Sequence, residues 1–558
     1  MNPPSWSLRG LLCLALTITS SYAQTLPVFR VQANQAGEAG AVNLAQLLFG
    51  LTEVQKSTTA NKRHFITSTD GTKCVEFDTT SGGFWVADHT QLWNTALKPK
   101  LVDEETALCL AEDLAKDCSL FPELKGPIRI KPGRIGGTFV AQETEVSPGQ
   151  NQRLEHQLDI SVNYDITILV QTPESTTPVE VPVVGGGGKF QLTFGDGGNL
   201  IGYQGLWRDV DVAGTKQYKI IPKSQADSHF LTSTTMFNDT LEFNSTLAYY
   251  SAPYGEFQDF LYPVYVFDAT AMVGEEFIQL RRTYFPATEF GPVDTFVREV
   301  LPPRRVTSQP SRHRSLRPRG TDDTRNEAGT EWIGVPYGLQ KTEQNAQGFR
   351  NQLLAGSGSW EILFNFGDDQ VWETDFDSQA DQYVDTTDFI FYTGHAGPTG
   401  WLANIPNKGG IKWVHYSIVG TFPETPGNLW GRGDLEWMVI AACGPLQDER
   451  FIAGGGNAFD RWRGMFDGLH IMFSYGTNSD DTSDEGRRLI AYAQNGAALI
   501  DSWFRTAKEL QPSSATVTAM WTAGPGGDSR NDHLTGYGMV TQDNPASSQV
   551  RWLMWSSC

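Results

Sequence analysis

Two residues of types that can carry out nucleophilic catalysis follow apolar runs in the C-terminal half of this 558-residue chain. The run Asp388–Tyr392 leads into Thr-Gly-His395-Ala-Gly, and the run Glu436–Ala442 leads into Cys443-Gly-Pro. If the two runs are neighbouring parallel strands, their carboxyl ends bring the imidazole and the thiol to one crevice. A thiol beside an imidazole can attack a carbonyl carbon, while the imidazole handles the protons of the thiol and the leaving group. The sequence therefore predicts a Cys443/His395 dyad that works through a thioester acyl-enzyme.

The dyad prediction depends on both residues occurring together. A histidine after a strand is more commonly a hydrogen-bonded loop residue, and a cysteine at a strand end is more commonly a buried small hydrophobe. Other hydrolase patterns are absent, since the chain has no G-x-S-x-G and no H-E-x-x-H, and too few residues follow Cys443 for a papain-type arrangement. The glycines around His395 would let a main-chain N–H approach a developing oxyanion, which nominates Ala396, Gly397 and Gly444 for the oxyanion hole.

These segments resemble a known family. Tyr392-Thr-Gly-His395-Ala-Gly is similar to the His loop, and Ala442-Cys443-Gly444 to the Cys loop, of the caspase-like (clan CD) cysteine peptidases, which include legumain, caspases, gingipains and separase. Caspases place the histidine about 50 residues before the cysteine, and here it precedes the cysteine by 48. Two positions depart from the family pattern: Ala396 stands where glycine is the norm, and Pro445 stiffens the turn after the cysteine.

The resemblance implies an endopeptidase, and it implies candidates for substrate recognition. In the family, a strand like Ile471–Tyr475 borders the primary specificity pocket, so Ser474 and Tyr475 become candidate pocket residues. Asp368 follows another apolar run and could make that pocket acidic, suited to Arg or Lys, although a solvated turn carboxylate is the more common explanation. The wider pattern from Glu331 to Glu373 also resembles an uncharacterised family of exported proteins with this arrangement.

No cofactor is expected. Asp480, Asp481 and Asp484 could bind calcium, but the EF-hand pattern is absent and a helix N-terminus accounts for their charge. The spacing of the histidines, among them His415, His470 and His533, indicates no metal site.

The elements that would position this site are predicted from hydrophobic periodicity. Near-continuous apolar runs are typical of parallel strands buried on both faces, so residues 330–558 are predicted to form an α/β, caspase-like layered domain with a mainly parallel sheet. A capping box at Thr482 and Glu485 and an apolar stripe from Leu489 to Phe504 predict one long helix. The further predicted strands of this domain are Trp360–Phe366, Ile411–Val419, His470–Phe473 and Thr516–Thr522.

Residues 24–300 are predicted to be an α+β, strand-rich N-terminal region. Helical spacing occurs at Ala41–Leu51 and Glu104–Leu114, and strand-type runs dominate from about residue 155. This region contains no recognisable catalytic constellation, so a prodomain or an accessory domain, in one or two subdomains, is the expected role. The Arg/Pro-rich segment 301–329 reads as a linker, and its dibasic pair Arg304-Arg305 is a candidate processing site.

Residues 1–23 read as a secretory signal peptide, so the mature chain is expected to be secreted. Sequons at Asn238 and Asn244 fit a glycoprotein. Removal of Cys13 leaves five cysteines, an odd number. If Cys443 is the free nucleophile, the expected disulfide bonds join Cys74, Cys109, Cys118 and Cys558 in two pairs.

Composition limits the partners. A net charge of −21 argues against nucleic acid or an anionic membrane, and 39% hydrophobic residues provide enough material for two or three cores. The expected partner is a peptide or protein substrate, and the oligomeric state is not readable. The leading hypothesis is an exported cysteine hydrolase; the alternatives are an inactive binding protein on the same fold and an acyl transferase or ligase that uses the same dyad.

Overall fold

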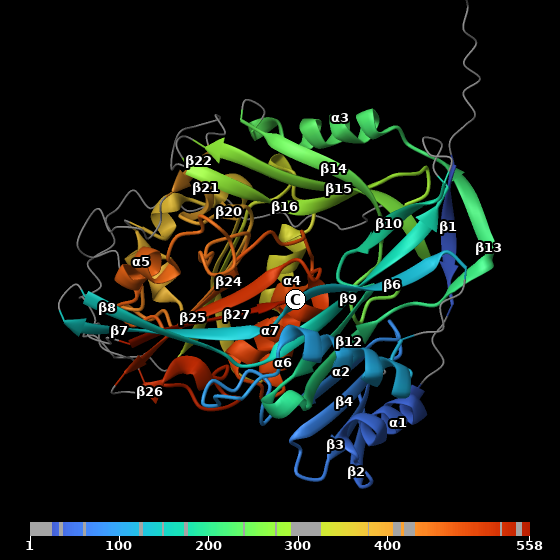
Figure 1. Ribbon diagram of the computed structural model, residues 1–558. Helices are drawn as coiled ribbons and strands as arrows, with labels where there is room; N and C mark the ends of the chain where they lie inside the picture. Colours follow the sequence, from blue (N-terminus) through green and yellow to red (C-terminus); the bar gives the residue numbers. More distant parts are fainter. Residues whose placement is uncertain are drawn as a thin grey trace, which may run out of the picture.

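A computed structural model shows how the two halves of the chain are arranged (Figure 1). Several sequence predictions fall outside the residues it describes: the signal peptide, Asn238 and the pair Arg304-Arg305. The structure describes residues 25–32, 37–59, 63–121, 126–147, 150–171, 177–237, 240–273, 276–291, 325–377, 379–404, 414–417, 430–524, 527–542 and 550–558.

Five parallel strands form one half of a ten-stranded sheet. Alternate residues of the central strands enter two different hydrophobic cores, one shared with three helices and one on the opposite face. Because both faces are buried, these strands are apolar throughout. The strands, in spatial order, are β18 (Trp360–Gly367), β17 (Asn326–Trp332), β19 (Phe389–Thr393), β23 (Trp437–Ala441) and β24 (Ile471–Tyr475). The helices of the first core are α4 (Thr342–Ala355), α6 (Glu485–Gln494) and α7 (Leu499–Leu510).

Antiparallel strands complete this sheet, and two of them come from the N-terminal region. After β24 the order continues through β25 (Thr516–Gly524), β27 (Val550–Ser557), β7 (Thr138–Ser147) and β8 (Gln150–Gln157). The short β26 (Gly527–Asp528) pairs with β25, and α5 (Ala458–Trp462) packs into the core on the face away from α4. In Figure 1 the long hairpin β7–β8 lies along β25 and β27.

The remaining strands form a large, mainly antiparallel assembly in which seventeen strands are linked by pairing. One part is covered by α1 (Gly37–Phe49), which packs on β3 and β4, and by α2 (Glu104–Asp117), which packs on β9. Its strands are β1 (Thr25–Val31), β2 (Val54–Thr58), β3 (Arg63–Ser68), β4 (Lys73–Asp78), β5 (Phe84–Asp88), β6 (Ile128–Gly136), β9 (Ile160–Val170), β10 (Val179–Val184), β11 (Lys189–Phe194), β12 (Leu200–Leu206) and β13 (Val210–Lys219).

The other part is a meander that reaches the C-terminal half. Strands β14 (Glu242–Tyr250), β15 (Phe260–Val273) and β16 (Glu276–Pro286) pair in sequence, beside α3 (Lys223–Ser233). Strand β16 then pairs with β20 (Ala396–Gly397), which continues into β21 (Gly400–Asn404) and β22 (Val414–Ser417). Strands from both sides of residues 301–329 therefore share both sheets. Strand β17 begins at Asn326, inside the segment predicted to be a linker.

Short 3-10 turns complete the regular structure at Asp196–Gly198, Thr235–Phe237, Val335–Tyr337, Asp368–Gln370, Glu373–Asp375, Ala380–Gln382, Val384–Thr386, Arg463–Met465 and Ser529–Asn531.

The predicted fold class is wrong. The chain is 43% strand and 24% helix, with mixed sheets dominated by antiparallel pairs, and this does not match an α/β, mainly parallel caspase-like domain. The apolar runs did locate strands, but an apolar run shows only that a strand is buried on both faces. Here the parallel and the antiparallel strands alike are covered on both faces by other layers of the structure. The apolar runs therefore could not show strand direction.

The prediction of one long helix is also wrong, because this segment forms two helices. Helix α6 ends before Asn495, and Gly496 follows with φ +85°, a conformation that favours glycine. The predicted capping box does not form: the residue before α6 is Asp484, and the Thr482 hydroxyl has no hydrogen-bond partner.

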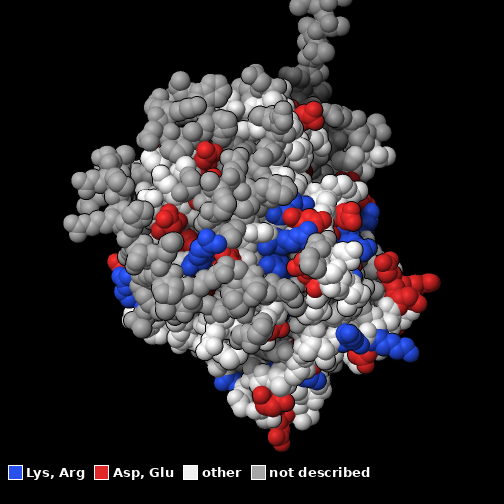
Figure 2. All heavy atoms as spheres, turned by 90° about the vertical axis from the view of Figure 1, so that its left-hand side faces the viewer, with Lys and Arg blue, Asp and Glu red and all other residues white. Residues whose placement is uncertain are grey.

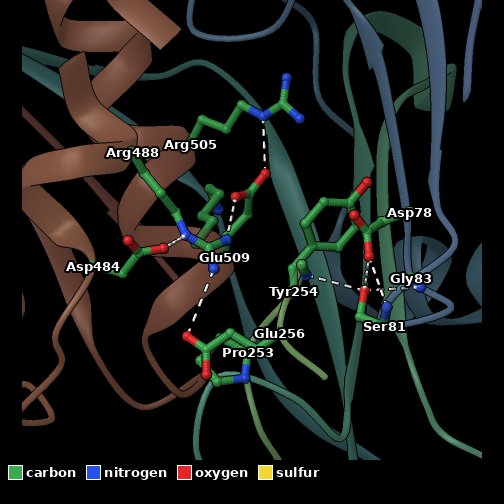
Figure 3. Close-up of polar contacts among 12 residues, drawn as sticks. Asp78, Ser81, Gly83, Pro253, Tyr254, Glu256, Asp484, Arg488, Arg505 and Glu509 are labelled. Carbon is green, nitrogen blue, oxygen red and sulfur yellow. Dashed lines mark hydrogen bonds and ion pairs between the residues drawn. The ribbon is translucent and has the colours of Figure 1, made fainter. Parts of the chain in front are cut away.

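Buried charges fasten the N-terminal region to helices α6 and α7 (Figure 3). Arg488 and Arg505 both bind Glu509, at 2.8 and 3.0 Å, and Arg505 also reaches Glu76 of β4 at 2.5 Å. The hydroxyl of Tyr254 donates to the same Glu76 at 3.1 Å. Because Glu76 and Glu509 are fully buried, these pairs are shielded from solvent and tie the two regions into one body.

Other charged side chains lie on the surface of the molecule. On the face shown in Figure 2, acidic and basic side chains of the described residues lie beside one another. Among the helices of the described part of the chain, none is long and apolar enough to cross a membrane.

Candidate active site

His395 and Cys443 lie just beyond the carboxyl ends of two adjacent parallel strands, at the same edge of the sheet. Strands β19 and β23 pair directly, with Thr393 opposite Ala441, and each reactive residue follows two positions after that pair. The juxtaposition predicted from the apolar runs is therefore present in the fold.

The imidazole of His395 is held between two main-chain groups. Its Nδ1 accepts the N–H of Arg281 at 3.0 Å, so Nδ1 carries no proton and Nε2 donates to the carbonyl of Tyr337 at 2.9 Å. The ring of Phe237 meets the imidazole edge-on, 5.8 Å between centroids. Burial lowers the pKa of His395 to about 4; the positive charge of Arg281 adds to this, and the bond to Tyr337 opposes it. His395 is thus a neutral, fully buried histidine.

The thiol of Cys443 is also enclosed. Its Sγ accepts the main-chain N–H of Ser479 at 3.2 Å and lies 3.5 Å from the Ser479 hydroxyl. Burial raises the pKa of Cys443, although Ser479 and the charge of Arg281 oppose the increase. Since both nitrogens of His395 are bonded elsewhere, the structure brings imidazole and thiol to one edge without bonding one to the other.

The residues predicted to form the oxyanion hole are packed against neighbouring strands. The N–H of Gly444 donates to the carbonyl of Tyr475 at 3.1 Å. Ala396 pairs with Gln279 of β16, and Gly397 pairs with Gly400 across a tight hairpin. Gly444 has φ +87°, and a side chain there would come within 3.3 Å of the Gln279 amide oxygen. Strand β16 therefore covers the loops that an oxyanion hole would use.

A buried arginine lies at the centre of this edge, and the sequence reasoning did not identify it. Arg281 of β16 extends its side chain across the ends of β19 and β23. Its guanidinium donates to the hydroxyl of Thr393 at 2.9 Å, to the carbonyl of Ala441 at 2.8 Å and to Glu485 at 2.8 Å. Nε also donates to the carbonyl of Asp480, at 3.1 Å. The available signal was an Arg-Arg pair inside an apolar strand, which is unusual for a strand that buries its faces.

Glu485 is fixed as a receptor for this guanidinium. Three neutral donors bind its carboxylate: Tyr475 at 2.7 Å, Gln511 at 2.9 Å and Asn345 at 2.6 Å. Burial opposes the charge of Arg281, but Glu485 and Asp481 outweigh it and hold the pKa of Arg281 above its usual value.

Of the three residues predicted to line the specificity pocket, one contacts the arginine pocket and two do not. Tyr475 reaches the arginine pocket through Glu485. Asp368 instead accepts the N–H of Gly334 at 2.7 Å, and the Ser474 hydroxyl donates to the carbonyl of Ile440 at 2.8 Å. Asp368 and Ser474 therefore have structural partners.

Protein donors bind the three carboxylates considered for calcium. Asp480 accepts the hydroxyl of Tyr284, Asp481 accepts the N–H groups of Gln340 and Lys341, and Asp484 pairs with Arg487 and Arg488. Within the described ranges, no group of three or more His, Cys, Asp or Glu side chains is arranged to hold a metal ion.

The expected disulfide bonds are not formed. Cys74, Cys109, Cys118, Cys443 and Cys558 are all free thiols, and Cys109 is exposed. The odd cysteine count therefore does not single out Cys443. The sequon residue Asn244 is exposed on β14.

Comparison with known proteins gives one family. The sequence model of a domain of unknown function, DUF6345, matches residues 330–557. No curated protein matches the chain.

Proposed function

We propose that this chain is a latent form of an exported cysteine hydrolase that cleaves peptide bonds, with Cys443 as nucleophile and His395 as general base. The observation that carries the proposal is the direct parallel pairing of β19 with β23, which delivers an imidazole and a free thiol to one sheet edge. Export rests on the leader-like residues 1–23.

The reaction needs only these two groups and water. His395 takes the thiol proton, and the Cys443 sulfur attacks the carbonyl carbon of the peptide bond. The carbon–nitrogen bond breaks, the imidazolium gives its proton to the leaving amine, and a thioester remains on Cys443. Water, deprotonated by His395, then hydrolyses the thioester and releases a carboxylic acid and the thiol.

Latency follows from the contacts of β16. The main chain of Arg281 occupies Nδ1 of His395, and Gln279 pairs with Ala396 beside it. A histidine nitrogen that already accepts a hydrogen bond cannot accept a thiol proton. Withdrawal of β16 would free Nδ1 and open the edge to a peptide.

A second candidate function has an observation in its favour. His395 and Cys443 are both fully buried and hydrogen-bonded, as structural residues are. A non-catalytic binding protein would keep this arrangement permanently.

A turnover experiment decides between the two. The full chain is treated briefly with trypsin, which cuts exposed arginine-rich segments, and after trypsin inhibition it is offered a panel of peptide substrates. We expect turnover by the wild-type chain and by the control Cys109→Ala, because Cys109 lies on the surface of α2. Cys443→Ala should be inactive. Equal turnover by Cys443→Ala would exclude the mechanism, and absence of turnover from every form would favour the binding protein.

A further inference from the structure

The arginine pocket uses every N–H of the guanidinium that fills it. Nε–H donates to the carbonyl of Asp480, which also accepts from Nη2, and the second Nη2 hydrogen goes to Glu485. The two Nη1 hydrogens go to Thr393 and Ala441. Five such contacts fit arginine, whose five donors have fixed directions, whereas a lysine ammonium offers only three.

The pocket and its occupant come from different parts of the chain. Thr393, Ala441, Asp480 and Glu485 all lie within residues 330–557, the segment that matches one family, whereas Arg281 lies outside it. The domain thus supplies a complete receptor for arginine, and the N-terminal region supplies the arginine.

The main chain around Arg281 lies as an added peptide would. Strand β16 is antiparallel to β20, with Gln279 opposite Ala396, so it extends the sheet next to the His loop. Addition of an extended segment to a sheet edge is a common mode of peptide recognition, with side-chain pockets giving specificity. The N–H of Arg281 on His395 shows that the residue filling the pocket lies next to the proposed base. A productive substrate would place its arginine side chain in the pocket without making this main-chain hydrogen bond, so that Nδ1 stays free.

We infer that Arg281 occupies the specificity pocket of the proposed hydrolase, and that the substrates are extended peptides with an arginine in that pocket. This inference rests on the proposed function. Strand β16 would act as an internal occupant that a substrate replaces, and cleavage would occur next to the arginine that fills the pocket.

The test compares Arg281→Ala with the matched control Arg282→Ala. Arg282 is the next residue of β16, but its guanidinium binds Asp268 at 2.8 Å and does not enter the pocket. The first measurement is the thermal midpoint in millimolar n-propylguanidine or n-propylamine. We expect n-propylguanidine to raise the midpoint of Arg281→Ala, because it refills the cavity. The wild type, Arg282→Ala and all samples in n-propylamine should show no comparable rise.

The second measurement is the rate at which peptidyl chloromethyl ketones label Cys443, followed by peptide mass spectrometry. In Arg281→Ala treated with trypsin as in the turnover experiment, an arginyl ketone should label Cys443 at least about tenfold faster than its leucyl analogue, as expected for a site built to hydrogen-bond its substrate. In the untreated wild type both should react slowly. If Arg281→Ala does not fold, the trypsin-treated wild type replaces it in the labelling experiment, with the same expected preference for the arginyl ketone.

The outcomes separate the two proposals. Labelling of Cys443 at equal rates by arginyl and leucyl ketones would overturn the arginine pocket and leave the hydrolase intact. Failure of every ketone to label Cys443 in any folded variant would overturn the hydrolase, and with it this substrate class. Absence of stabilisation by n-propylguanidine in folded Arg281→Ala would also overturn the pocket.

Discussion

The main-chain N–H of Arg281 donates to Nδ1 of His395 at 3.0 Å, so a strand of the N-terminal region fixes the tautomer of the histidine that the sequence nominates as a base. The guanidinium of the same residue donates to the carbonyl of Ala441, two residues before Cys443, and to Glu485. One arginine therefore fixes the tautomer of the imidazole and binds the end of the strand that leads to the thiol. In this arrangement β16 covers the edge of the sheet at His395 and Cys443, and the side-chain contacts around it can be removed by single substitutions.

The burial of His395 should make stability depend on pH. Its folded pKa is about 4, below the ordinary value of 6.5, so between these values the unfolded chain binds a proton that the folded chain does not. The stabilisation of the folded chain that depends on a neutral His395 is complete above pH 6.5 and is lost as the pH falls towards 4. The free energy of unfolding should decrease by about 3 kcal/mol over this range.

Urea denaturation of the wild type and His395→Gln at several pH values measures this change. Glutamine can accept from Arg281 and donate to Tyr337 but does not titrate, so subtracting the two curves removes the other titrating groups. A difference curve that stays flat from pH 7 to pH 4 would contradict the burial of His395.

The thiol of Cys443 should react slowly in the folded chain. It is fully buried and its pKa is raised, whereas Cys109 is exposed on α2, and thiolate content and access together set alkylation rates. We expect iodoacetamide at neutral pH to modify Cys109 at least about a hundredfold faster than Cys443. Mass spectrometry of the digested protein measures both rates, and denaturation in urea should bring them together. Comparable rates in the native chain would mean that β16 does not cover the thiol.

The sequence was informative where burial determines residue type. Strands β19 and β23 are apolar because both of their faces are covered, so their ends, and hence His395 and Cys443, could be located from the runs alone. The break between α6 and α7 was also readable in principle, since Asn495-Gly496 is a turn signal inside the apolar stripe.

Other features were beyond such reasoning because they arise from contacts distant in the sequence. Nothing near Arg281 indicates that β16 pairs with β20, more than a hundred residues later. Likewise, nothing near β7 indicates that it pairs with β27 at the end of the chain. Apolar spacing reports burial, and the partner that causes the burial must be found in the fold.

The ion pair between Arg281 and Glu485 should be strongly coupled. Arg281→Met leaves a buried carboxylate without its cation, which typically costs about 3–5 kcal/mol in the free energy of unfolding. Glu485→Gln leaves a buried guanidinium and should cost a similar amount. The double variant removes both charges, so its loss should be smaller than the sum of the single losses. A double-mutant cycle in urea measures the coupling, and additive losses would show that the pair does not interact.

The buried ion pairs within helices α6 and α7 should matter more than exposed ones. Glu509 binds both Arg488 and Arg505 without access to solvent, so Glu509→Gln leaves two guanidinium groups short of a carboxylate (Figure 3). We expect a loss of about 3–5 kcal/mol in the free energy of unfolding. The matched control is Glu38→Gln, which breaks the half-exposed pair with Lys56 and should cost at most about 1 kcal/mol. Urea denaturation in low and high sodium chloride measures both. High salt should reduce the difference in the free energy of unfolding between the wild type and Glu38→Gln. It should leave the difference between the wild type and Glu509→Gln nearly unchanged, because screening acts on exposed charges. Equal losses for the two variants would mean that solvent reaches the Glu509 cluster.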